Sequence, residues 1–68
     1  MNWDTEELID IIDNDETMYW LAKDIVKYED TIAAKVTELR WMLQHVDSPI
    51  DIAEVNWEAV IDHFLEES

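Results

Sequence analysis

The stretch "MYWLAKDIVKYEDTIAAKVTELRWMLQHV", residues 18–46, decides the fold of this chain, because it contains no Gly or Pro and has an apolar residue every three or four positions. This spacing predicts helix. Counted in heptads from Met18, eight of the nine core positions are apolar and the phase never resets: Met18, Leu21, Ile25, Tyr28, Ile32, Lys35, Leu39, Met42 and Val46. Three further residues widen this stripe, namely Ala22, Val36 and Leu43. The unbroken phase favours one long helix.

The alternative is a break at "YEDT", residues 28–31, where Asp30 would cap a second helix. Helices longer than about 25 residues are unusual in small globular domains and are typical of coiled coils. We therefore expect an all-α fold, a small bundle of three to four helices. Its central helix is long and either continuous or broken near Asp30, with short amphipathic helices at both ends.

The residues before this stretch predict a first helix. Asp4 and Glu7 have the spacing of a capping box, with Asp4 as the N-cap. Trp3 and Leu8 stand where a hydrophobic staple would place them. The run "DND", residues 13–15, ends the helix, since Asp and Asn side chains compete for the backbone in turns.

The residues after the stretch predict a last helix. Ser48 and Pro49 stop the central helix, and Asn56 is the expected N-cap, with Val55 and Val60 as its staple. The apolar residues that follow keep to one helical face: Trp57, Val60, Ile61, Phe64 and Leu65.

Length and composition bound the class of protein. Sixty-eight residues make one domain, residues 1–68, which needs large core side chains or oligomerisation for stability. The chain has no Cys, which excludes disulfides and thiolate sites. The sequence has no run of about 18 uncharged apolar residues, so it predicts no membrane span. The first residues, "MNWDTEEL", are acidic where a signal peptide would be basic, so we expect a cytoplasmic protein.

Charge is the strongest feature of the composition. Eighteen acidic residues against four basic ones give a net charge of −14. Residues 1–22 and 47–68 each hold seven acids and no Lys or Arg, whereas residues 23–46 hold four acids and all four bases. A field of this sign repels nucleic acid and anionic lipid and attracts basic surfaces. The expected partner is therefore a basic protein, with no direct binding of nucleic acid or membrane.

Residue types that perform chemistry are scarce, so we predict no enzyme, no catalytic residue, no cofactor and no metal site. His45 and His63 fall in different predicted helices without a metal-ligand spacing. The run "DNDE", residues 13–16, lacks the Gly and the final Glu of a calcium loop and predicts a capping turn.

Two tryptophans, Trp20 and Trp41, fall on the side of the central segment opposite the stripe, at 100° per residue. They have two interpretations. In the first, the terminal helices cross this side and bury the two tryptophans. In the second, the tryptophans stay exposed as aromatic anchors for a partner, since Trp is enriched at interface hot spots.

The acids of the two terminal helices also form faces. Glu6, Asp10 and Asp13 share one face of the first helix, and the last helix carries a second set, Glu58, Asp62 and Glu66. In charge, size and helicity the chain resembles the small acidic helical proteins with which bacteriophages and mobile elements block host enzymes by imitating DNA. The resemblance implies an inhibitor that occupies the basic groove of a nucleic-acid-binding protein. Since carboxylates occur without interspersed Lys or Arg only in the terminal helices, we expect these six carboxylates to form the binding surface.

Two alternatives remain open. In the first alternative, the chain is a helical adaptor or homodimer, and its acidic residues only keep it soluble. It would then use Trp20, Trp41 and the stripe residues Leu21, Ile25, Tyr28, Ile32, Leu39 and Met42. Alternatively, the acidity reflects a proteome adapted to high salt, which few lysines and abundant Asp also fit.

Overall fold

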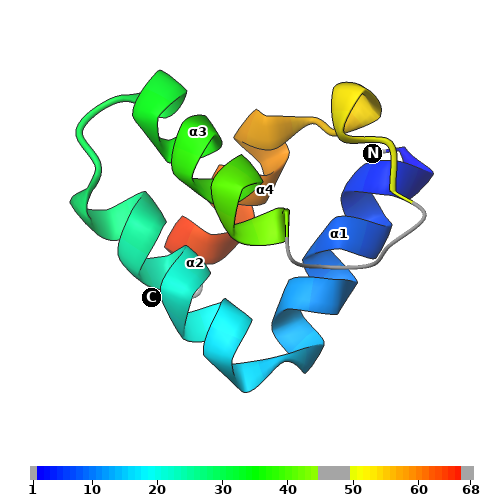
Figure 1. Cartoon of the computed structure of the whole chain (residues 1–68), viewed down its shortest axis with the longest axis horizontal. Coiled ribbons are helices and arrows are strands. Elements are labelled where there is room, and N and C mark those ends of the chain that lie inside the picture. The colour runs from blue at the N-terminus through cyan, green and yellow to red at the C-terminus, as the bar shows by residue number, and fades with distance from the viewer. Residues whose placement is uncertain (1, 45–49, 67–68) are drawn as a thin grey trace.

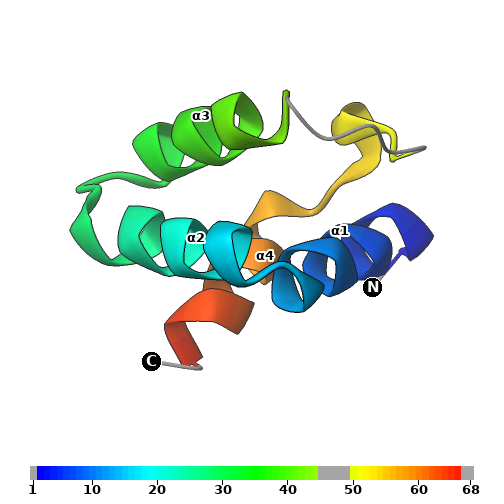
Figure 2. The ribbon, with the colours of Figure 1, turned by 60° about the horizontal axis from the view of Figure 1, so that its bottom comes forward.

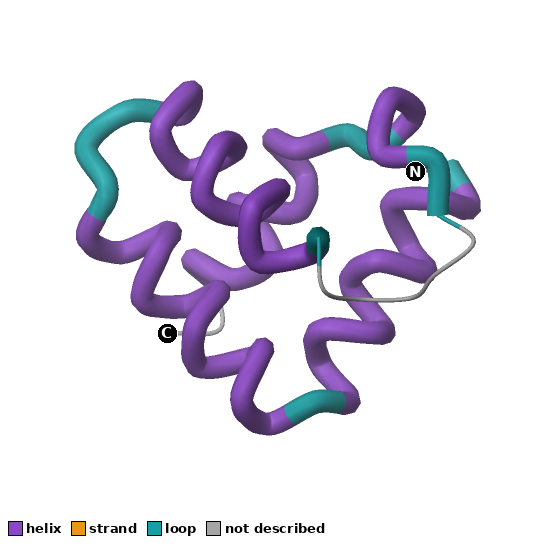
Figure 3. Tube along the Cα trace, in the orientation of Figure 1, coloured by secondary structure: helices purple, strands orange, loops and turns teal. Residues whose placement is uncertain are grey.

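Four α-helices make up most of the chain that the computed structural model describes, residues 2–44 and 50–66. They are α1 (Trp3–Asn14), α2 (Glu16–Tyr28), α3 (Ile32–Leu43) and α4 (Trp57–Glu66), with a short 3-10 turn, η1 (Ile52–Glu54), before α4 (Figure 1). The described residues contain no strand, as the tube in Figure 3 makes plain. The predicted all-α bundle is confirmed.

The prediction of one continuous central helix is wrong. The chain leaves the helix at Glu29 and starts again with Thr31 as N-cap, whose extended backbone (φ −122°, ψ 157°) lets its side chain accept a hydrogen bond from the Ala34 N–H at 3.1 Å. The break therefore falls beside Asp30, but the cap is Thr31. The heptad count along the sequence continues through residues 29–31 although they are not helical, so the apolar phase does not reveal the break.

The two halves of the stripe instead face each other across a hairpin. Helix α3 lies beside α2 in Figures 1 and 2, connected to it by the short loop after Tyr28. Leu39 of α3 has no exposed surface, and Ala22 and Val26 of α2 are buried with it. Leu39 is thus the one described heptad position of the stripe that is fully buried, and the others are half-buried or exposed.

The cap of α1 also differs from its prediction. Asn2 is the N-cap, and its Oδ1 accepts a hydrogen bond from the Thr5 N–H at 2.9 Å. Asp4 lies inside the helix, and its Oδ1 accepts from the Asp51 N–H at 3.1 Å, which connects α1 to the segment before η1. Since Trp3 is the first helical residue and is largely exposed, it does not form the predicted staple.

The start of α4 matches its prediction. The Asn56 Oδ1 accepts a hydrogen bond from the Ala59 N–H at 3.2 Å, and both Val55 and Val60 are buried. Phe64 is also fully buried, whereas Leu65, at the edge of the same face, is exposed. The predicted stop at Ser48 and Pro49 lies outside the described residues, as do two other residues of the sequence predictions, His45 and Val46.

One core joins all four helices. Figure 2 shows α1 and α2 in a middle layer, with α3 on one side and α4 on the other. The buried apolar residues form a single cluster: Leu8, Ile9, Ile12, Ala22, Val26, Leu39, Leu43, Val55, Val60, Ile61 and Phe64. No described helix is long and apolar enough to cross a bilayer.

Helices α1 and α4 run in the same direction, which is decisive for the distribution of charge. At their N-terminal ends, the buried Thr5 Oγ1 accepts a hydrogen bond from the Asn56 N–H at 2.8 Å. Toward their C-terminal ends, the Asp13 Oδ2 lies 3.0 Å from the His63 Nε2. The two contacts are eight residues apart on α1 and seven apart on α4, so the helices keep parallel register over about two turns.

Candidate functional site

The parallel pairing of α1 and α4 places the two predicted acidic faces on adjacent helices, which meet where Asp13 contacts His63. We call this the α1–α4 acidic surface, and its six residues are all exposed: Glu6, Asp10, Asp13, Glu58, Asp62 and Glu66. On α1, Asp13 points toward α4, because it contacts His63. On α4, Glu66 follows His63 by three residues and neighbours it on the helix surface, whereas Asp62 is adjacent in sequence and points away from it.

His63 sits at the seam of this surface. Its side chain is about one-third exposed, its Nε2 contacts Asp13, and its ring packs edge-on against Phe64 with centroids 4.9 Å apart. Asp62 does not take part in this contact, as its adjacent position on the helix predicts. Among residues 2–44 and 50–66, no group of three His, Asp or Glu side chains could hold a metal ion.

The run "DNDE", residues 13–16, is the predicted capping turn. Asp15 ends α1 and begins α2, and its Oδ1 accepts a hydrogen bond from the Met18 N–H at 3.1 Å. Asp13, two residues earlier, is directed to α4 instead. The carboxylates of this run therefore serve two separate contacts.

The basic residues lie apart from the acidic surface, on α2 and α3. The Lys23 Nζ lies 3.2 Å from the Tyr19 hydroxyl and 5.7 Å from the centre of the Trp20 ring. The Lys27 Nζ lies 5.3 Å from the centre of the Tyr28 ring. The Lys and Arg residues thus belong to the α2–α3 hairpin, and Lys23 and Lys27 also line a depression with Phe64 and Leu65 of α4.

The predicted dimer stripe is divided by this hairpin. Leu39 is part of the protein's own core, so it is not available to a second chain. Ile25 and Met42 are half-buried. Leu21, Tyr28 and Ile32 are exposed, and Tyr28 keeps 69% of its surface in solvent. About half of the stripe therefore remains a surface of α2 and α3.

The tryptophans are not buried under the terminal helices, which corrects one of the two interpretations. Trp20 is 56% exposed and Trp41 is 63% exposed. They do not share one anchor site, because Trp20 lines a small depression with Phe64 and Leu65, whereas Trp41 lines a different hollow. The break at residues 29–31 separates them by placing one on α2 and the other on α3.

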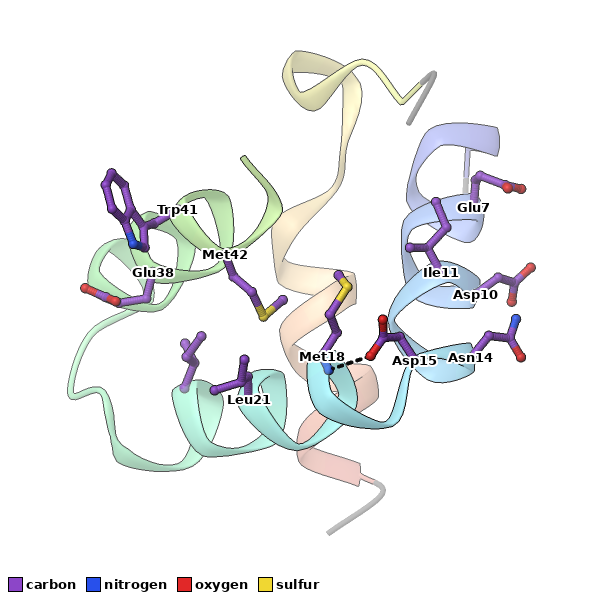
Figure 4. A pocket seen from close by; sticks show the side chains of 11 residues that line it. Glu7, Asp10, Ile11, Asn14, Asp15, Met18, Leu21, Glu38, Trp41 and Met42 are labelled. Atoms are coloured by element: carbon purple, nitrogen blue, oxygen red, sulfur yellow. Dashed lines mark hydrogen bonds between the residues drawn. The ribbon is translucent and has the colours of Figure 1, made fainter. Parts of the chain in front are cut away.

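The hollow that Trp41 lines is a groove of about 950 Å³ between α1, α2 and α3, which we call the α1–α3 groove. Figure 4 shows Met18, Leu21 and Met42 directed into the space between α2 and α3. Other apolar lining residues are Ile11 and Ile25. The polar lining residues are acidic or amide side chains, namely Glu7, Asp10, Asn14, Asp15 and Glu38.

The sequence predictions did not include this groove. A signal for it exists on α1, where Ile11 falls outside the face that Leu8 and Ile12 present to the core. An apolar residue that lies outside the core-facing side of its helix indicates a second apolar contact. Its partner residues on α3 could not be found from periodicity, because they depend on how the hairpin folds back.

Comparison of the chain with protein-family models, curated proteins and solved structures gives no significant match.

The density of carboxylates predicts that salt stabilises the fold. Fourteen uncompensated negative charges repel one another, and salt screens them over a Debye length of about 8 Å at physiological ionic strength. We expect the melting temperature to rise between low salt and about 0.5 M NaCl, measured by circular dichroism. A variant with Glu6→Gln, Asp10→Asn, Glu58→Gln and Asp62→Asn should show a smaller rise.

A melting temperature that stays flat over this range would contradict the prediction. A protein that folds only in molar salt would instead favour adaptation to high salt as the origin of the acidity.

Proposed function

We propose that this protein is a small acidic inhibitor that occupies the basic, nucleic-acid-binding surface of another protein through the α1–α4 acidic surface. The observation that carries the proposal is the contact between Asp13 and His63, which sets two base-free acidic helices side by side. We place this action in the cytoplasm, a site that the lack of Cys suits. It is a binding function and involves no catalysis.

Spacing supports imitation of DNA. Successive carboxylates on α4 are four residues apart, or about 6 Å along the helix axis, and those on α1 are three or four apart. Two parallel rows together supply a carboxylate about every 3 Å. One strand of B-DNA carries a phosphate about every 3.4 Å of its axis. The α1–α4 acidic surface thus approaches the charge density of a single DNA strand.

Charge reversal on this surface tests the proposal. Wild-type protein is immobilised, bacterial lysate is applied at low salt, and retained proteins are eluted with duplex DNA. We expect a nucleic-acid-binding protein to be released by DNA and also by salt. The Asp62→Lys/Glu66→Lys variant should bind the purified partner at least tenfold more weakly, about 1.4 kcal/mol, because like charges then oppose each other.

The matched control is Asp24→Lys/Asp30→Lys, which changes the net charge equally at exposed positions of α2 and the following loop. It should reduce affinity much less than the α4 variant does. Equal losses in the two variants would mean that only net charge matters. If charge reversal on α4 leaves affinity intact while Trp41→Ala abolishes binding, imitation of DNA is wrong.

A second function is favoured by a separate observation, the exposure of large apolar side chains on α2 and α3. Tyr28, Ile32 and Trp41 each leave more than half of their surface in solvent. This exposure supports an adaptor that docks a partner protein, or a second copy, through the α2–α3 hairpin.

A further inference from the structure

We propose that the α1–α3 groove binds a cationic amphipathic helix of a partner protein. The partner helix would lay its apolar face on Met18, Leu21 and Met42 and direct Lys or Arg side chains to the acidic rim. The inference rests on the adaptor function just proposed and specifies the chemistry of the partner. The groove shares one residue, Asp10, with the α1–α4 acidic surface and is otherwise lined by different residues.

The floor of the groove suits the apolar face of a helix. Met18, Ile25 and Met42 pack against the core but are only partly buried, and Leu21 is exposed. Methionine side chains are flexible and adapt to apolar surfaces of different shape, and two of them lie in this floor. A helix of about 14 residues is about 21 Å long. That length fits a molecule whose extents are 28 × 23 × 21 Å.

The rim determines the charge of the occupant. Glu7 and Asp10 of α1 line one side, and Glu38 of α3 lines the other. In Figure 4 these three side chains point outward from their helices, at the outer borders of the groove. None of the four Lys and Arg residues of the chain lines the groove. An acidic or neutral helix would leave these carboxylates without a counter-charge, whereas Lys or Arg beside an apolar stripe would meet them on both sides.

A helix is the expected form of the occupant, because the groove is bordered by helices. Peptides that bind as extended strands add to an exposed sheet edge, and the described part of the chain has no sheet. Amphipathic helices bind in apolar grooves through residues spaced i, i+3, i+4 and i+7. Exposed Trp41 at the border of the groove adds an aromatic contact of the type that dominates interfaces.

A second copy of this chain is a poorer occupant on the same grounds. Each copy carries a net charge of −14, so a dimer through this face would bring acidic rims together. The stripe residue Leu39, which a symmetric helical seam would need, is buried in the protein's own core.

The test uses defined peptides and the intact protein. Four fluorescein-labelled peptides of about 14 residues are compared by fluorescence anisotropy at physiological salt. The first has Leu on one helical face and Lys elsewhere, the second has Glu in place of Lys, and the third has the composition of the first in scrambled order. The fourth is a Gly/Ser peptide with the same number of Lys. We expect the first to bind at least tenfold more tightly than each of the others.

Variants locate the binding site. The Leu21→Gln/Met42→Gln variant keeps the side-chain volume but makes the groove floor polar. It should weaken the binding of the first peptide, with Leu on one face and Lys elsewhere, at least tenfold. Glu38→Gln should reduce the affinity for this peptide less, and Asp62→Lys/Glu66→Lys should leave the affinity near the wild-type value. Urea unfolding of each variant, followed by circular dichroism, establishes that the variant is folded before its affinity is compared.

Other outcomes overturn the inference in distinguishable ways. If Tyr28→Ala/Ile32→Ala abolishes binding and Leu21→Gln/Met42→Gln does not, the adaptor function stands and the groove is not its site. If the scrambled peptide binds as tightly as the ordered one, the attraction is only electrostatic and both ideas fail. If sedimentation shows a dimer that Leu21→Gln/Met42→Gln dissociates, a second copy occupies the groove.

Discussion

Replacing Phe64 with alanine is expected to lower the free energy of unfolding by about 3–5 kcal/mol. The Phe64 ring has no exposed surface and packs edge-on against Tyr19 of α2, with ring centroids 6.1 Å apart. It therefore joins the last helix to the second, and its removal leaves a cavity in the core. A chain of this length has about 3–10 kcal/mol of stability in total, so much of the variant should be unfolded.

Leu65→Ala is the matched control, since it truncates the neighbouring residue of the same helix at an exposed position. Urea unfolding followed by far-UV circular dichroism measures both variants. The control should lose about 1 kcal/mol or less. Similar losses at the two positions would mean that the core does not include the face of α4 described above.

Replacing Thr5 with valine is expected to cost about 2–3 kcal/mol. Thr5 is the one buried polar side chain among the described residues. Its hydroxyl donates to the Asn2 Oδ1 at 2.6 Å and accepts from the Asn56 N–H at 2.8 Å, so it connects the cap of α1 to the start of α4. Valine keeps the shape and leaves the partly buried Asn56 N–H without an acceptor.

Thr5→Ser separates the contribution of the Thr5 hydroxyl to stability from that of its methyl group. Serine retains both hydrogen bonds and loses one buried methyl, which should cost about 1 kcal/mol. Denaturant titration of the two variants side by side makes the comparison. A valine variant as stable as wild type would show that the hydroxyl bridge contributes nothing, and a serine variant less stable than the valine variant would assign the effect to packing.

Local chemistry explains which sequence predictions were right. The start of α4 was predicted from Asn56, Val55 and Val60, because a cap and its staple lie within five residues of one another. The capping turn at residues 13–16 was predicted for the same reason. The cap of α1 was misplaced by two residues, since Asp4 has a second use that depends on distant Asp51.

The break in the central segment shows where periodicity is insufficient. A stripe of constant phase predicts one seam, but the phase is counted along the sequence and continues through residues 29–31, which are not helical. The sequence therefore could not distinguish a long helix from a hairpin of two. The hairpin buries Leu39 inside one chain, where a long helix would have required a partner to cover it.

By itself the sequence determined the helical class, the acidic ends and the neutral centre, because apolar spacing, capping residues and charge are properties of neighbouring residues. Only the tertiary structure decided that Asp13 meets His63, so that two acidic faces become one surface. It also decided that Ile11, Leu21 and Met42 border a common groove, while Trp20 and Trp41 line separate hollows. These juxtapositions depend on the direction in which each helix returns across the core, and that direction is set by the packing of all four helices together.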